Sequence, residues 1–130
     1  QNMSLFKNIF GSSEEENKTS KIAWRQLTDL GQLNEIVEVS NEKLVLIFKH
    51  STRCSISRYS LKQFENEFTF EDKIVPYFLD LIAHRDVSNE IAQRFGVFHE
   101  SPQIILIKEG KAIYDASHES IDAKKLETFI

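Results

Sequence analysis

The segment Leu44–Ser57 reads LVLIFKHSTRCSIS and joins a run of apolar residues to the only cysteine of the chain. Its first part, Leu44–Phe48, is rich in branched side chains and has no polar interruption, a pattern typical of a central β-strand buried on both faces. The spacing of apolar residues after Ser55 predicts a helix. Cys54 is therefore expected at the junction between a buried strand and a helix.

The residues before this segment predict one strand and one helix. Ile22–Leu27 fits a short edge strand. Thr28 or Asp29 can cap the helix that follows, because either side chain can accept a hydrogen bond from a free backbone N–H. The apolar side of that helix carries Leu30, Leu33, Ile36 and Val37.

The residues after Cys54 predict a second helix and another strand. The apolar side chains assigned to the helix are Ile56, Tyr59, Leu61, Phe64 and Phe68. Ile74–Ile82 has the composition of a strand, although Pro76 lacks the N–H that pairing at its position would need. A third helix is expected to be capped by Asp86 or Ser88 and to end at Gly96, which tolerates a left-handed backbone.

The C-terminal third predicts a hairpin and a closing helix. Gln103–Lys108 and Lys111–Ala116 read as strands joined by a Glu109-Gly110 turn. Ser120–Ile130 is expected to be the last helix. Strands and helices thus alternate along most of the chain, which predicts an α/β domain with a central mixed sheet flanked by helices.

The 130 residues are enough for one domain with a single core. Residues 1–20 are expected to be a tail and linker, and residues 21–130 the domain, because Ser12–Ser20 is polar without an apolar period. Gln1 and Asn2 precede the only methionine and are expected to be left over from expression. Leu5, Phe6, Ile9 and Phe10 have helical spacing, so the tail is either weakly ordered or a short amphipathic turn.

Composition argues against several classes of protein. Sixteen basic and twenty acidic residues give a net charge of -4, which makes nucleic acid an unexpected partner. No apolar run has the length of a membrane span, and Met3–Gly11 is too short and too polar for an export signal. A single cysteine allows no internal disulfide, so a reducing cytoplasm is the expected location.

Cys54 is the candidate reactive group. A thiol reacts as its thiolate, and the free N–H groups at a helix start stabilise that anion. Arg53 and Lys49 add positive charge nearby, and the Ser57 hydroxyl, one helical turn on, can donate a hydrogen bond to sulfur. The alternative is a buried structural cysteine that only packs. The strand–helix junction favours the reactive thiol, because α/β folds usually place their sites there.

His50, four residues before Cys54, is a candidate proton relay, or else a polar residue at the mouth of the site. The other histidines, 84, 99 and 118, have no two-ligand helical spacing, and one cysteine gives no zinc signature. A metal site made by this chain is therefore not expected. Gly110-Lys111 lacks the remaining residues of a phosphate-binding loop and fits a hairpin turn instead.

Two motifs carry a resemblance to a known family. Lys49–Ser57 (KHSTRCSIS) and His99–Gln103 (HESPQ) resemble the monothiol bacilliredoxins of the thioredoxin superfamily, over roughly residues 22–130. The resemblance implies a thioredoxin-like fold and a thiol–disulfide oxidoreductase whose nucleophile is Cys54. Family members commonly carry Thr-Cys-Pro-Ile-Ser, so Ser55 stands here in place of a proline.

The same resemblance implies roles for further residues. The Ser101-Pro102 peptide bond should be cis and face Cys54, which would leave the Ser101 backbone free to pair with a substrate strand. Arg53, Ser55 and Ser57 are the residues expected to stabilise the thiolate.

Two departures from dithiol thioredoxins imply a one-cysteine cycle. Those proteins carry a second cysteine where this chain has Ser57, and a buried acid where it has Phe48. The resemblance implies that Cys54 removes bacillithiol, or a comparable small thiol, from client proteins with no bound cofactor. An external thiol or a reducing partner protein would then release it.

Two other functions fit the sequence less closely. A thioredoxin-fold interaction module, such as a stress adaptor, would bind peptides without using Cys54. A monothiol-glutaredoxin-like protein could hold an iron–sulfur cluster between two subunits, but the glycine and aromatic residue of that motif are missing.

Overall fold

β2 (Leu44–His50) lies at the centre of a five-stranded sheet with the strand order β1-β3-β2-β4-β5. The structure is a computed structural model that describes residues 22–130, so the expected tail and linker lie outside the described residues. β2 runs parallel to β3 (Ile74–Asp80) and antiparallel to β4 (Gln103–Lys108). All its side chains after Leu44 are buried, which confirms the prediction of a central strand.

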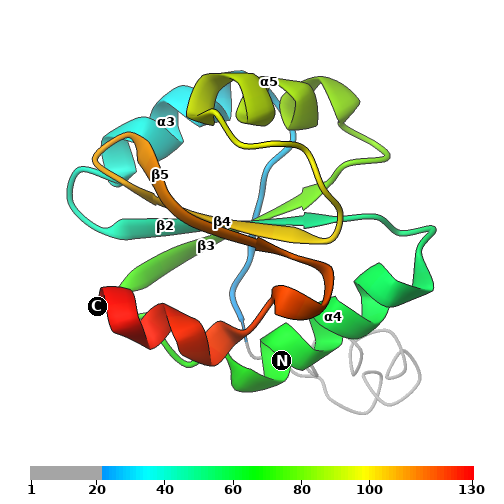
Figure 1. The fold of residues 1–130 in the computed structure, drawn as a ribbon. Coiled ribbons are helices and arrows are strands. Elements are labelled where there is room, and N and C mark those ends of the chain that lie inside the picture. The colour runs from blue at the N-terminus through cyan, green and yellow to red at the C-terminus, as the bar shows by residue number, and fades with distance from the viewer. Residues whose placement is uncertain (1–21) are drawn as a thin grey trace, which may run out of the picture.

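Helices cover both faces of this sheet, as Figure 1 shows. The elements that form these layers are α3 (Gly31–Val39) and α5 (Arg85–Phe95) on one face, and α4 (Ser55–Glu67) and the 3-10 helix η2 (Ala123–Phe129) on the other. The predicted α/β class with a mixed sheet is confirmed.

Alternation along β2 divides the core into two layers, because successive side chains of a strand point to opposite faces. Val45 and Ile47 belong to the layer under α3 and α5, with Leu33 and Ile91. The other layer lies under α4 and η2 and is rich in aromatic rings. In it, the Phe64 ring centroid lies 5.4 Å from that of Phe48 and 5.2 Å from that of Phe68.

Of the two edge strands, β1 is shorter than predicted and β5 is one residue longer. β1 is only Arg25–Gln26, although the N–H of Leu27 still donates to the carbonyl oxygen of Phe78 at 2.8 Å. β5 is Lys111–Ser117 and forms the predicted hairpin with β4, with a bulge at Leu106/Ile107.

Pro76 is accommodated within β3 by the shortness of β1. The carbonyl of Phe78 points toward β1, so Pro76, two residues earlier, presents its backbone to the same side. β1 begins opposite Tyr77, so Pro76 has no partner residue on that side of β3. The missing N–H therefore breaks no ladder hydrogen bond, and pairing with β2 is uninterrupted along the whole of β3.

The start of α3 differs slightly from the prediction. The helix begins at Gly31 with Leu30 as its N-cap, and Asp29 acts one position earlier, where its Oδ1 accepts from the N–H of Gly31 at 2.7 Å. The Thr28 N–H instead donates to Oε1 of Gln32 at 2.7 Å. Leu30, at the N-cap, is exposed, whereas Leu33 and Ile36 within the helix are buried.

The buried side of α4 was predicted wrongly in part. Ile56 and Tyr59 are 61% and 69% exposed, whereas Ser57, Ser60 and Phe64 face the sheet. The stripe that meets the core follows helical spacing from residue 57, and Ile56 and Tyr59 each lie one position before it. Two small serines thus occupy the buried side near the start of the helix.

The caps of the later helices also correct the sequence predictions. α5 begins at Arg85 with His84 as its N-cap, so Asp86 and Ser88 lie inside the helix. Gly96 ends it with a φ of 66°, the left-handed conformation that was predicted.

The C-terminal segment is not the single helix expected over residues 120–130. It forms two 3-10 helices, η1 (His118–Ser120) and η2. Asp122 lies between them and starts η2, because its Oδ1 accepts from the N–H of Lys124 at 3.0 Å.

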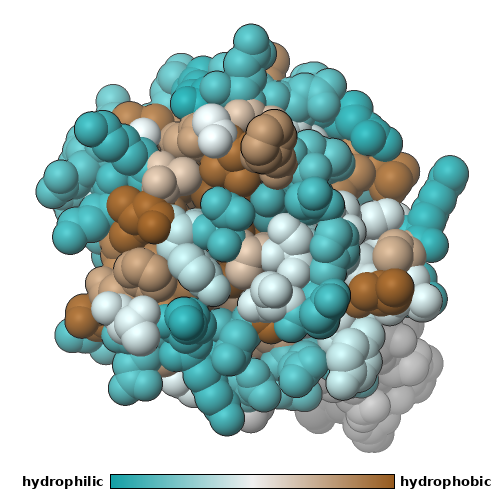
Figure 2. Space-filling view, in the orientation of Figure 1, coloured by the Kyte–Doolittle hydropathy of each residue, from teal (hydrophilic) through white to brown (hydrophobic). Residues whose placement is uncertain are grey.

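On the face shown in Figure 2, hydrophobic side chains form separate small groups among hydrophilic ones. The structure describes no helix long and apolar enough to cross a membrane within residues 22–130.

Replacing Phe64 by alanine should lower the free energy of unfolding by about 3–5 kcal/mol, because the ring is buried at the centre of the aromatic layer. Tyr59→Ala on the same helix is the matched control and should change it by no more than about 0.5 kcal/mol. Denaturant titration measures both. Equal losses in the two variants would contradict the orientation of α4.

Candidate active site

Cys54 lies where β2 and α4 meet. β2 ends at His50, and the chain turns so that the N–H of Cys54 donates to the carbonyl oxygen of Ser51 at 3.2 Å. Cys54 is the N-cap of α4, with extended φ and ψ of -112° and 121°, and its carbonyl oxygen accepts from the N–H of Arg58 at 3.1 Å. The residue is half-buried. A thiol in this position is near the free N–H groups of a helix start and still within reach of another molecule.

Cys54 is half-buried between exposed neighbours. Arg53 and Ser55 are both exposed. Among the described residues, no hydrogen bond to the Cys54 sulfur is found. Arg58 holds the loop from the helix side, because its guanidinium donates to the carbonyl oxygen of Thr52 at 3.1 Å. That Arg53 and Ser55 stabilise the thiolate stays a prediction.

Ser57 is completely buried and faces His50. Its Oγ accepts from the N–H of Ser51 at 3.1 Å and lies 2.8 Å from Nδ1 of His50. The Ser57 hydroxyl, in the first turn of α4, therefore contacts both His50 at the end of β2 and Ser51 in the segment that leads to Cys54. If His50 Nδ1 carries a proton, the Ser57 hydrogen is left free for the sulfur; if not, Ser57 donates to the imidazole.

His50 itself is 4% exposed, on the same face of the sheet as Phe48. Burial lowers its pKa, and Arg58 adds to that effect, while Asp80 and Glu65 oppose it. The imidazole is therefore neutral near pH 7 and can both donate and accept a proton. A relay role for His50 stays a prediction.

The Ser101-Pro102 peptide bond is cis, as the family resemblance implies. The carbonyl oxygen of Pro102 accepts from the N–H of His118 at 3.0 Å. Within residues 22–130 the Ser101 hydroxyl is buried without a hydrogen-bond partner, and the Ser101 backbone makes no hydrogen bond either. The expected role of Ser101 and Pro102 in positioning a substrate stays a prediction.

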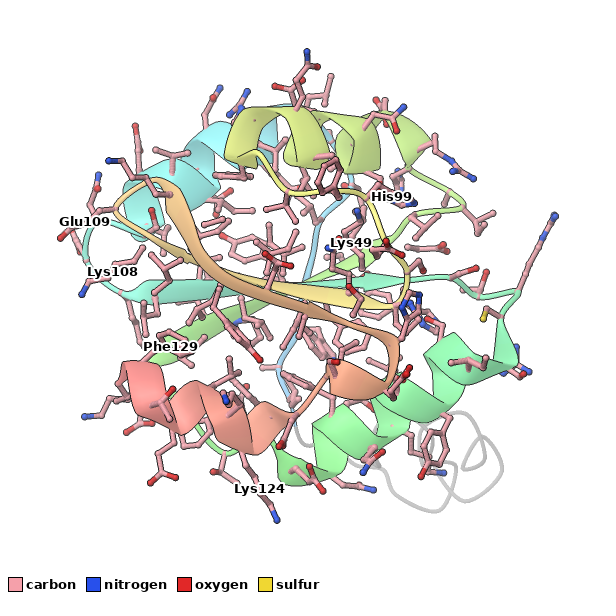
Figure 3. All side chains as sticks on the ribbon, in the orientation of Figure 1. Lys49, His99, Lys108, Glu109, Lys124 and Phe129 are labelled. Carbon is pink, nitrogen blue, oxygen red and sulfur yellow. The ribbon has the colours of Figure 1, made fainter. Side chains whose placement is uncertain are left out.

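Sequence reasoning missed the contact between Lys49 and His99. Lys49 was expected only to add positive charge near Cys54, but it is fully buried and its Nζ lies 2.7 Å from Nδ1 of His99. Figure 3 places the two side by side between α5 and the sheet. Burial lowers the pKa of Lys49 to about 8, while Glu100 opposes this. The signal in the sequence was a lysine directly after Leu44–Phe48, the strand predicted to be buried on both faces; in the structure β2 continues through Lys49 to His50.

Two hollows in the part of the chain that the structure describes lie away from the thiol. A cavity of about 460 Å³ lies at the other end of β2, beside Leu44 and close to Lys108, Glu109 and Phe129, labelled in Figure 3. A second hollow of about 450 Å³ lies between α5 and residues 96–99, beside the loop that leads to Ser101. In the part of the chain that the structure describes, no three His, Cys, Asp or Glu side chains gather as a metal site would require.

The family model for the monothiol bacilliredoxin BrxC matches residues 25–126. The chain belongs to the monothiol bacilliredoxin family. This match spans β1 to η2 and includes both motifs, with Cys54 and with Ser101-Pro102. Membership of the bacilliredoxins supports a thiol redox role for the protein.

Solved structures agree with this fold. A protein with a thioredoxin fold, described as a candidate oxidoreductase, is 32% identical, with a TM-score of 0.69, over 79% of this chain and 89% of that one. Thioredoxin from Malassezia sympodialis is 20% identical, with a TM-score of 0.64, over 85% of this chain and 90% of that one. Fasciola hepatica thioredoxin is 18% identical, with a TM-score of 0.62, over 82% and 95% of the two chains. The last two matches show the thioredoxin fold alone.

The lowered pKa of His50 predicts a pH effect on stability. Between its folded and unfolded pKa values the folded protein binds fewer protons, so stability is lost as the pH falls below about 6.5. His50→Gln removes this titration and keeps a group that can hydrogen-bond to Ser57. Denaturant titrations at pH 7.5 and pH 5 should show a larger loss in the wild type than in His50→Gln. Equal losses would show that His50 is not buried in its neutral form.

Proposed function

We propose that this bacilliredoxin removes bacillithiol, or a comparable small thiol, from mixed disulfides on client proteins in a one-cysteine cycle. The observation that carries the proposal is Cys54 itself, half-buried at the start of α4, with a buried serine at position 57. The thiol is accessible to another disulfide, and the position one helical turn away offers a hydroxyl instead of a second sulfur.

The first step is a thiol–disulfide exchange. The Cys54 thiolate attacks the bacillithiol sulfur of the mixed disulfide, a Cys54–bacillithiol disulfide forms, and the client sulfur leaves as a thiolate that takes up a proton. The helix start offers N–H groups to the attacking thiolate, and the exposed Arg53 adds a positive charge beside it. No net oxidation or reduction occurs in this step.

The second step needs a thiol from outside the protein. Ser57 cannot form a disulfide, and the chain has no other cysteine. A second small thiol, or a cysteine of a reducing partner protein, therefore attacks the Cys54 mixed disulfide and restores the Cys54 thiolate. A reducing cytoplasm, where such thiols are kept reduced, is the proposed location.

The loop before β4 is proposed to hold the client. Since the Ser101 backbone makes no hydrogen bond within residues 22–130, it is free to pair with an extended client segment beside the mixed disulfide. The hollow beside residues 96–99 lies next to this loop and can take an apolar side chain of the client.

Incubation with oxidised bacillithiol should add the mass of one bacillithiol to the wild-type protein, because attack by Cys54 releases one reduced bacillithiol. Intact-mass spectrometry measures the adduct. Cys54→Ser should gain no mass, and oxidised glutathione should react less. If neither disulfide gives an adduct on the wild type, the protein is an interaction module in which Cys54 is incidental.

Replacing Ser57 by cysteine should convert the cycle to an internal one. The new thiol would lie one helical turn from Cys54 and could attack the Cys54–bacillithiol disulfide. After exposure to oxidised bacillithiol, Ser57→Cys should lose two hydrogens and carry no adduct. Ser60→Cys, one turn further along the same buried side of α4, is the matched control and should keep the adduct. An adduct that persists in Ser57→Cys would contradict the assignment of position 57 as the resolving position.

A further inference from the structure

Lys49 is a cation in the interior with an unusual partner. Its side chain is 0% exposed, and it points to the opposite face of β2 from His50, toward α5. No carboxylate in residues 22–130 lies within ion-pair distance of its Nζ. The group that it meets is the ring of His99, at 2.7 Å, which also lies 3.4 Å from Oγ of the buried Ser88.

Burial restricts what Lys49 can do. A side chain with no exposed surface cannot receive a substrate or an anion from solution, so a ligand site at its Nζ is excluded. A charged group is retained in an interior only when it is paired or hydrogen-bonded, because its desolvation is costly. What the ammonium can do here is donate to Nδ1 of a neutral His99 and so fix the loop that carries that ring.

That loop is held from beneath by a second buried residue. Gln103 lies opposite Lys49 in the β2–β4 ladder and is 1% exposed. Its Nε2 donates to the carbonyl oxygen of Phe98 at 3.0 Å, and its Oε1 accepts from the N–H of Glu100 at 3.4 Å. Lys49 and Gln103, which are neighbours across the sheet, thus contact the three residues that precede Ser101, namely residues 98–100.

The far side of the loop is also fixed. His118 binds Pro102 through its backbone, and its ring lies 3.6 Å from a carboxylate oxygen of Glu100. Residues 98, 99, 100 and 102 therefore each have a partner, whereas Ser101 has none within residues 22–130. The contacts leave one set of backbone groups unpaired, at the residue before the cis proline.

We propose that Lys49 is a positioning residue, which holds His99 and, together with Gln103, fixes the loop so that Ser101 is presented unpaired to the client strand. The inference rests on the proposed function for the identity of the client, a protein with a small thiol on one cysteine. The contacts of Lys49 and Gln103 with the loop belong to the folded chain and can be measured without any substrate.

The charges around His99 agree with this arrangement. Burial lowers the pKa of His99, and the cations Lys49 on β2 and Arg85 on α5 lower it further, while Glu100 on the loop opposes them. A neutral ring keeps a lone pair for the Lys49 ammonium. Removing the charge of Lys49 should therefore raise the pKa of His99.

The test is Lys49→Met, which keeps the length of the side chain and removes its charge. Hydrogen exchange should become about five- to tenfold faster at the amide of Glu100, whose N–H donates to Gln103, as expected for the loss of about one hydrogen bond. NMR titration should show the raised pKa of His99. The KM for a bacillithiolated client should rise while kcat stays near the wild-type value, and alkylation of Cys54 by iodoacetamide should be unchanged.

Lys108→Met is the matched control, because Lys108 is exposed at the other end of β4 from Gln103. It should leave all four measurements at the wild-type values. His99→Ala, a change at an exposed residue, should reproduce the faster exchange and the higher KM. The double variant should add little to either single one, because both remove the same contact.

Two failures are distinguishable. Unchanged loop exchange and an unchanged pKa of His99 in Lys49→Met would overturn the role of Lys49, whatever the activity. A wild-type protein that does not react with the bacillithiolated client would overturn the proposed function, while the exchange and titration results would still decide whether Lys49 holds the loop.

Discussion

The burial of β2 on both faces is the constraint on which the other features of the molecule depend. A strand without a solvent-facing side requires a helical layer on each face, and α3 and α5 provide one while α4 and η2 provide the other. The strand ends in two polar residues, Lys49 and His50. Because successive side chains of a strand point to opposite faces, these two enter different layers. Each is buried and must find a partner there.

The partners of these two residues build the site. His50 meets Ser57 and so fixes the first turn of α4 on which Cys54 is the cap. Lys49 meets His99 and so fixes the loop that ends in the cis Ser101-Pro102 bond. One short stretch of strand therefore connects the thiol with the segment proposed to hold its client. Position 57 is occupied by a hydroxyl that is already engaged, which agrees with a cycle in which an outside thiol performs the second step.

Sequence patterns were sufficient for features set by local chemistry. The apolar run at Leu44–Phe48, the left-handed Gly96 and the Glu109-Gly110 hairpin depend on residues close together in the chain, and each was predicted. Ile56 and Tyr59 were wrongly predicted to be buried. Apolar residues occur on more than one side of α4, and tertiary packing decides which side faces the sheet. The Lys49–His99 contact joins residues 50 positions apart, so no local pattern could pair them.

In the proposed cycle, Cys54 takes the small thiol from the client and holds it. The most direct measurement mixes a client carrying one bacillithiol with an equal amount of this protein, without any other thiol, and follows the intact masses of both. If Cys54 performs this exchange, the mass of bacillithiol moves from the client to Cys54 and the client is recovered with a free thiol. A client joined to Cys54 by a disulfide, or a client that keeps its bacillithiol, would contradict it.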